Sequence, residues 1–276
     1  MTENGILVEE RGRVAILTMY RPALKNAFDE HMFLELDRAT GALFKMQPRA
    51  VVLTGCEAVF CAGFDVNPDN PWVAELIHSV EKSDRQAAEA LVGRVRKIVD
   101  RFASLPVPII AAINGLAYGG GAELAVRCDL RVMDPAAEIC FSETRLGLMP
   151  DWGGGAALAH LIGPSRAADV ILTARPVAAG EAINIGLVNR VSRPGESREE
   201  AVRVAEIISK NGPRAVGYAL GMIRESRNQS FYRSLDMEMD KAVSLIASGE
   251  CFHGVAAFLE KRKPEFPDVA YQDLTA

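Results

Sequence analysis

Three acidic residues stand beside glycine-rich turns in the middle of the chain, where acidic side chains can transfer protons. Glu123 follows the run Gly119–Gly121, Glu143 lies in CFSETRLG, and Asp151 lies in LMPDWGGG. Carboxyl groups held near a reacting centre act as general acids and bases. Each acid also has a structural interpretation: Glu123 as a first-turn acid that complements a helix dipole, Glu143 as a solvated loop charge, and Asp151 as a helix N-cap. Spacing alone does not decide between the two interpretations.

Two glycine turns could supply backbone N–H groups to the same chemistry. The run Gly119–Gly121 follows an apolar segment and opens a helical one, but no Lys-Ser/Thr pair follows it as in a phosphate-binding loop. Backbone N–H groups at a helix N-terminus attract negative charge, so the turn predicts a site for a developing oxyanion. The segment FCAGFD (60–65) follows another apolar run. Taken alone it indicates only a turn; beside the first turn it would supply a second donor.

Other kinds of catalytic site find no support in the sequence. There is no GxSxG motif, and the four histidines have no metal-ligand spacing. The five cysteines form no CxxC pair, and their odd number is typical of reduced thiols in an intracellular protein. We expect no metal and no cofactor.

Short apolar runs alternate with helical segments along the first half of the chain. This alternation predicts an α/β fold. Each glycine turn comes a few residues after an expected buried strand, at 50–53 and at 109–113, which would position it. The expected elements are a hairpin (6–9 and 14–19), a helix capped by Asp29 and ending near 46, strands at 50–53, 109–113, 130–133 and 138–141, a long amphipathic segment at 72–103, and a mostly helical region beyond 153 with one short apolar run at 187–191.

Length and composition place the chain among ordinary globular proteins. It has 276 residues, of which 49% are hydrophobic and 24% charged, with a net charge of −5. The acidic balance argues against a dedicated nucleic-acid binder. The uncharged stretch 102–122 is as long as a membrane span, but its prolines and glycines would break a spanning helix. The first residues lack the basic segment of a signal peptide. We expect a cytoplasmic protein without a membrane span.

Six blocks of sequence, in order, resemble the crotonase family, the enoyl-CoA hydratase/isomerase superfamily. They are RPALKNAF (21–28), VVLTG (51–55), FCAGFDV (60–66), PVPIIAAINGLAYGGGAELAVRCDLRV (106–132), CFSETRLGLMPDWGGG (140–155) and GVAAFLEKRKPEF (254–266). The resemblance implies a spiral of repeated ββα units with terminal helices that pack on neighbouring subunits. It thus implies a core at 1–196, a helical oligomerisation region at 197–276, and a homo-trimer or hexamer.

The same resemblance implies an acyl-coenzyme A thioester as substrate. The two backbone N–H groups that hold the thioester oxygen in this family match Phe64 and Gly120. The two glutamates of its hydratases match Glu123 and Glu143, which favours hydration of an enoyl-CoA. Asp151 departs from the hydratase pattern, which has glycine there, and matches an acid of dienoyl-CoA isomerases. An isomerase is therefore the alternative, and a thioesterase or C–C hydrolase of the same fold is a more distant one.

The family also suggests where coenzyme A lies. Backbone groups of two segments would cradle the nucleotide, and Lys261 would approach its phosphate, often from a neighbouring subunit. The acyl group would lie against residues 66–86 and Trp152. The residues expected to bind substrate are Lys25, Asn26, Ala27, Cys61, Ala62, Gly63, Asp65, Trp152 and Lys261.

Overall fold

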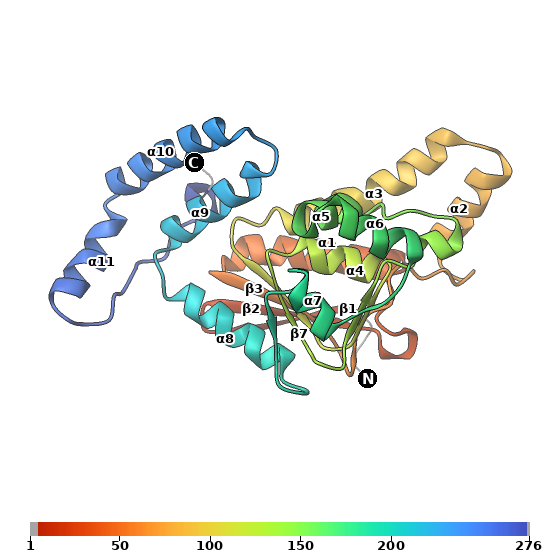
Figure 1. Ribbon diagram of the computed structural model, residues 1–276, viewed down its shortest axis with the longest axis horizontal. Helices are drawn as coiled ribbons and strands as arrows, with labels where there is room; N and C mark the ends of the chain where they lie inside the picture. The colour runs from red at the N-terminus through yellow and green to blue at the C-terminus, as the bar shows by residue number, and fades with distance from the viewer. Residues whose placement is uncertain (1–4, 275–276) are drawn as a thin grey trace.

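Two β-sheets form the centre of the protein (Figure 1). The computed structural model describes residues 5–274. One sheet has six strands in the order β1-β2-β3-β5-β7-β10, and the other has four in the order β4-β6-β8-β9. The strands are β1 (Gly5–Arg11), β2 (Val14–Tyr20), β3 (Ala50–Gly55), β4 (Val59–Cys61), β5 (Ile109–Ile113), β6 (Leu116–Tyr118), β7 (Leu130–Met133), β8 (Glu138–Cys140), β9 (Val177–Ala178) and β10 (Arg190–Val191).

Successive strand pairs divide between the two sheets. β3, β5 and β7 are parallel neighbours in the first sheet, and β4, β6 and β8 are parallel neighbours in the second. Each pair is followed by one or two helices, so the chain advances by one ββα unit per turn. This is the spiral α/β fold that the resemblance implied. Of the second sheet only β8 was predicted, at 138–141. Its other strands, β4, β6 and β9, were missed because strands of two or three residues are too short to show an alternation of apolar and polar residues.

The first helices follow the expected pattern, with one correction. The hairpin β1–β2 is antiparallel, and α1 (Glu30–Met46) is capped by Asp29, whose side chain accepts the N–H of Met32. The prediction of a single amphipathic segment at 72–103 is wrong. It forms two helices, α2 (Pro71–Glu81) and α3 (Arg85–Ala103), because Ser83 takes a left-handed backbone conformation and Asp84 caps the second helix.

Helices cover both faces of the six-stranded sheet. Buried residues of α1, α3 and α4 (Gly120–Arg127) share one apolar core with the β-strands. On the opposite face, α8 (Ser197–Ser209) packs Ala201, Val202 and Ala205 against β2, β3, β5 and β7. The first helix of the expected oligomerisation region therefore contributes to the core. The remaining helices of this part are α5 (Gly154–Ile162), α6 (Pro164–Thr173) and α7 (Ala179–Asn184), with short 3-10 turns at Pro22–Leu24 and Glu143–Leu146.

The last helices form an arm beside the sheets (Figure 1). It consists of α9 (Pro213–Ser226), α10 (Phe231–Ala247) and α11 (Glu250–Leu259), followed by a 3-10 turn at Tyr271–Leu274. Arg224 anchors the arm to the core through an ion pair of 2.6 Å with Asp129. Within residues 5–274 no single helix is long and apolar enough to cross a membrane; α10 and α11, bent by 71°, meet that criterion only as a pair.

Candidate active site

A cavity of about 140 Å³ lies where the two glycine turns meet, and it brings the three sequence-predicted acids together. Glu123, Glu143 and Asp151 all line it, as do Phe64 and Gly120. The rest of its wall is mostly apolar and includes Ala62, Val66, Leu76, Leu91, Val92, Leu146, Leu148, Met149 and Trp152. Acids in an apolar cavity are the arrangement expected of groups that transfer protons.

The two glycine turns are in direct contact. A Cβ atom added to Gly63 would lie 2.9 Å from the backbone N of Gly120, and the φ of Gly63 is +95°. Only glycine fits there without strain. Gly120 is the first residue of α4, whose N-terminal N–H groups have no partner within the helix. Phe64 N–H makes no hydrogen bond to any residue in the described range 5–274. Phe64 and Gly120 both line the cavity, so their N–H groups are candidate donors to a molecule bound there.

Glu123 is the most buried of the three acids, with 1% of its surface exposed. It lies in the first turn of α4, where its side chain accepts three backbone N–H groups from the segment that leads into α5. Oε1 accepts from Asp151 at 3.1 Å, and Oε2 accepts from Trp152 at 2.9 Å and Gly154 at 2.8 Å. These bonds fix both carboxyl oxygens.

Glu143 has the opposite environment. Both of its carboxyl oxygens are buried, and neither has a conventional hydrogen-bond partner among the described residues. The residue begins the 3-10 turn after β8, and Oε1 would lie 3.8 Å from a Cβ atom on Gly119. A buried carboxyl with free oxygens can take or give a proton to a molecule in the cavity.

Asp151 does not cap the following helix, so that expectation is wrong. The N-cap of α5 is Gly153, with φ of +90° and no side-chain cap, and the carboxyl that binds the first N–H of α5 belongs to Glu123. Asp151 is exposed at the cavity wall and contributes its backbone N–H to Glu123. A residue three positions before the helix lies too far from the N–H groups that a cap must reach.

The three carboxyls influence one another's protonation. Burial, followed by the charge of Glu143, raises the pKa of Glu123 from 4.5 to about 8, although backbone N–H groups oppose the shift. Burial also raises the pKa of Glu143. The pKa of Asp151 is raised by loss of surrounding water, against the effect of the Arg96 guanidinium. Neighbouring acids with raised pKa values can share a proton near neutral pH.

Trp152 joins the cavity to an aromatic cluster. Its indole lies over Gly120, where an added Cβ atom would come within 2.5 Å of the ring. Its ring centroid lies 5.7 Å from that of Phe28 and 5.0 Å from that of Phe33, both edge-on. Trp72 stacks on Phe33 at 5.0 Å. These contacts hold the Trp152 ring against the turn that presents the Gly120 N–H.

The residues expected to bind coenzyme A fall into different environments. Lys25 is exposed, and its carbonyl accepts the N–H of Ala62 at 3.0 Å, which joins the two expected segments. Asn26 is fully buried, and its side chain binds backbone groups of Arg21 and Val59. Lys261 is exposed at the end of α11. The others are Ala27, Cys61, Gly63 and Asp65, which are buried.

Several residues around the site were not anticipated. Leu146, Leu148 and Met149 line the cavity from the loop after Glu143, and Leu91 and Val92 line it from α3. The loop residues belong to the block LGLM, and its apolar residues between Glu143 and Asp151 were a usable signal in the sequence. Leu91 and Val92 of α3 lie outside the range 66–86 that was expected to form the acyl pocket. The sequence of a helix does not show which of its faces will contact a turn far away in the chain. No group of three His, Cys, Asp or Glu side chains in residues 5–274 is arranged to hold a metal ion.

Comparison with known proteins agrees with the geometry. The profile of the enoyl-CoA hydratase/isomerase family matches residues 9–269. A short-chain-enoyl-CoA hydratase of Clostridium acetobutylicum is 33% identical, covering 96% of this chain and 98% of its own. A crotonyl-CoA hydratase of Syntrophomonas wolfei is 31% identical, covering 96% and 99%. The crystal structure of an enoyl-CoA hydratase from Bacillus anthracis superposes with a TM-score of 0.85 at 32% identity, covering 96% and 99%. The chain belongs to the enoyl-CoA hydratase/isomerase family.

Proposed function

We propose that the protein is an enoyl-CoA hydratase, which adds water across the α,β double bond of an enoyl-CoA thioester. One observation carries the proposal: two buried carboxyls with raised pKa values, those of Glu123 and Glu143, line the same cavity as Phe64 and Gly120. Named hydratases that are similar over nearly the whole chain support it.

In the proposed reaction the thioester oxygen accepts the N–H groups of Phe64 and Gly120. Water attacks the β-carbon and gives one proton to the carboxyl pair, and electrons of the double bond move to the thioester oxygen as an enolate. The two N–H groups and the N-terminus of α4 stabilise that charge. A carboxyl of the pair then delivers a proton to the α-carbon. The product is the 3-hydroxyacyl-CoA, and the pair returns to its starting protonation.

An enoyl-CoA or dienoyl-CoA isomerase is the second candidate, and the position of Asp151 favours it. Its side chain lines the cavity, and its backbone N–H binds Glu123. A third acid there could carry a proton between carbon atoms of the substrate without adding water.

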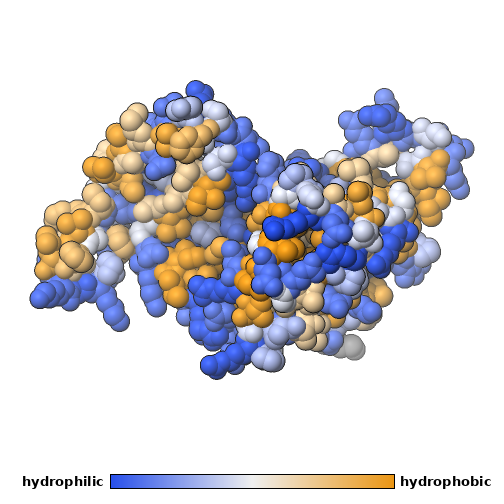
Figure 2. All heavy atoms as spheres, in the orientation of Figure 1, coloured by the Kyte–Doolittle hydropathy of each residue, from blue (hydrophilic) through white to orange (hydrophobic). Residues whose placement is uncertain are grey.

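The proposal includes binding of coenzyme A along residues 25–27 and 61–63 and assembly as a trimer or hexamer. An apolar stripe on α10 supports the assembly: Tyr232, Leu235, Met239, Val243 and Ile246 are all exposed, and α10 has no buried residue. Figure 2 shows apolar residues gathered over the arm. Such a stripe is typical of a surface that packs on another helix. Lys261 would then reach the nucleotide phosphate of a neighbouring subunit. The five free thiols are compatible with a cytoplasmic enzyme.

The test is incubation of the purified protein with enoyl-CoA, dienoyl-CoA and 3-enoyl-CoA thioesters, followed by mass analysis. A hydratase adds the mass of one water to the 2-enoyl-CoA. An isomerase leaves the mass unchanged while shifting the double bond, and a hydrolase releases free coenzyme A. The proposal is wrong if no 2-enoyl thioester gains water under conditions where another product forms.

A further inference from the structure

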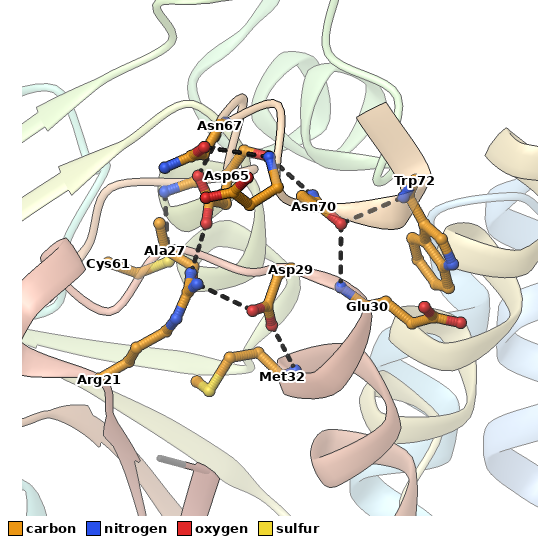
Figure 3. A network of polar contacts seen from close by, with 12 residues as sticks. Arg21, Ala27, Asp29, Glu30, Met32, Cys61, Asp65, Asn67, Asn70 and Trp72 are labelled. Carbon is orange, nitrogen blue, oxygen red and sulfur yellow. Dashed lines mark hydrogen bonds and ion pairs between the residues drawn. The ribbon is translucent and has the colours of Figure 1, made fainter. Parts of the chain in front are cut away.

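A buried arginine, Arg21, is held between the carboxylates of Asp29 and Asp65 (Figure 3). Asp65 follows Phe64 directly in the chain. Arg21 Nη1 lies 2.7 Å from Asp65 Oδ2, and Nη2 lies 2.8 Å from Asp29 Oδ2. The side chains of Arg21, Asp65 and Asp29 are 11%, 10% and 20% exposed. The free-energy cost of removing such charges from water offsets most of their attraction, so the cluster is not explained by a gain in stability alone. A role in fixing the backbone around Phe64 explains it better.

The cluster fixes the backbone on both sides of Phe64. Gly63 O accepts the N–H of Phe28 at 2.8 Å, and Asp65 N–H donates to Phe28 O at 2.8 Å. Asp65 is itself bound at its other polar atoms: Oδ1 accepts from Asn67 N at 3.0 Å, and its carbonyl accepts from Asn70 Nδ2 at 2.7 Å. Phe64 therefore lies between two peptide groups that are both hydrogen-bonded to Phe28, and the bond to Gly63 O sets the direction of the Phe64 N–H in the same peptide group.

The guanidinium of Arg21 also holds the segment around Phe28, which is the other partner in these backbone hydrogen bonds. Arg21 Nη1 donates to Ala27 O at 3.0 Å, one residue before Phe28. Asp29, one residue after it, accepts the N–H of Met32 at 2.9 Å and so ties the segment to the start of α1. One arginine thus joins residues 27–29 to residue 65.

We propose that Arg21, through Asp65 and Asp29, is a positioning residue that holds the Phe64 N–H in place for the oxyanion. The inference rests on the proposed function only in that the cavity must stabilise a thioester oxyanion. None of the three charged residues lines the cavity. Their effect is therefore indirect: donors stabilise developing charge when they are already in place, and small displacements from that position cost much of the rate.

This assigns Asp65 a role different from contact with coenzyme A. Both carboxylate oxygens of Asp65 are occupied by Arg21 and Asn67. A contact residue would change the affinity for coenzyme A, whereas a positioning residue changes the stabilisation of the enolate. These two quantities can be measured separately.

The test compares Asp65→Asn and Arg21→Lys with the parent enzyme. Asparagine keeps the shape and the bond from Asn67, but it loses the ion pair with Arg21. We expect kcat for a 2-enoyl-CoA to fall by about 10–100-fold, less than the ~10²–10³-fold for removing a donor outright, with KM and the Kd for coenzyme A unchanged. The second readout is the near-ultraviolet absorbance of bound acetoacetyl-CoA, whose enolate absorbs where the keto form does not. The enolate fraction should fall in both variants.

Asp129→Asn is the matched control, because it breaks a buried ion pair with Arg224 that lies outside the site. It should lower the melting temperature while leaving kcat and the enolate signal unchanged. If Asp65→Asn does not fold, Asp29→Asn replaces it, since asparagine caps a helix as well as aspartate.

Three results would overturn the inference. The first is an unchanged enolate signal in the folded Asp65 and Arg21 variants. The second is a loss confined to coenzyme A affinity, and the third is an equal loss of enolate in the Asp129 control. A parent enzyme that forms the bound enolate but hydrates no enoyl-CoA would contradict the proposed hydratase. In that case a reduced enolate signal in the variants would still support the role of Arg21.

Discussion

Glu123 Oε2 accepts the backbone N–H of Gly154, the first residue of α5, at 2.8 Å. An acid in the first turn of one helix thus caps the next helix. A Cβ atom on Gly154 would lie 2.5 Å from the Cβ of Glu123, so glycine is required for this approach. The contact binds one member of the carboxyl pair to the backbone, whereas the carboxyl oxygens of the other, Glu143, have no conventional hydrogen-bond partner within residues 5–274. Substitutions of the two glutamates should therefore differ in their effects.

Glutamine at either position should lower hydration by at least ~10²-fold, the lower end for loss of a general acid or base. The effects on stability should be unequal. Above pH 8, where Glu123 is ionised, Glu123→Gln places an amide NH2 against backbone N–H donors. It should lower the free energy of unfolding there by about 1–3 kcal/mol, because a buried donor loses its acceptor. Glu143→Gln loses no hydrogen bond and removes a repulsion, so stability should be unchanged or higher. Kinetics and urea unfolding of both variants test this; near-parent hydration in either one would contradict the two-acid mechanism.

The raised pKa of Glu123 predicts a pH dependence of stability. Between its unfolded value of 4.5 and its folded value of about 8, the folded protein holds a proton that the unfolded chain has released. Stability must then fall as pH rises through this window. Glu123→Gln should reduce the slope, while Glu265→Gln, at an exposed position, should not. The urea midpoint measured from pH 5 to 9 tests this, and parallel curves for parent and Glu123→Gln would rule out the raised pKa.

Gly120 offers a test of the oxyanion donor that separates sterics from hydrogen bonding. Alanine and proline there both introduce a Cβ atom that meets the Trp152 ring, but only proline removes the N–H. Proline is tolerated at the first position of a helix, so the fold can be retained. We expect kcat to be ~10²–10³-fold lower for proline than for alanine, the range for one lost donor. Equal rates in two folded variants would exclude Gly120 as a donor.

Asp151→Asn separates the two candidate activities. Because Asp151 does not cap α5, the substitution should leave stability unchanged. In a hydratase it should also cost less than the ~10²-fold typical of a lost acid or base, and this is the outcome we expect. Steady-state rates with 2-enoyl-CoA and dienoyl-CoA thioesters test it. If turnover disappears while the fold and coenzyme A affinity persist, the isomerase replaces the hydratase.

The apolar stripe of α10 predicts a homo-oligomer. Light scattering at micromolar concentration should give three or six times the chain mass of 29.9 kDa. Val243→Asp places a charge in the stripe and should reduce the mass, whereas Asp240→Asn on the same helix should not. A parent protein that scatters as a single chain would contradict the assembly.

The sequence determined those elements of the fold that depend only on residues close together in the chain. The hairpin, α1 with its Asp29 cap, and the strands β3, β5 and β7 follow from apolar patterning and local capping, both of which act over a few residues. The glycine turns and three acids were also visible, because their residue types are unusual beside apolar segments. The break between α2 and α3 was missed because it depends on the left-handed backbone conformation of Ser83, which the residue type serine does not predict.

What only the tertiary structure decided is which groups meet. Asp151 had every local feature of a helix cap, yet Glu123, 31 positions before Gly154, occupies that role. Arg21 and Asp65 gave no sign of pairing across 44 residues, and both proved to be buried and bonded to each other. Hydrogen bonds and ion pairs depend on distances of a few ångströms. The packing of the two sheets sets those distances between residues far apart in the chain. A pattern of neighbouring residues therefore cannot predict them.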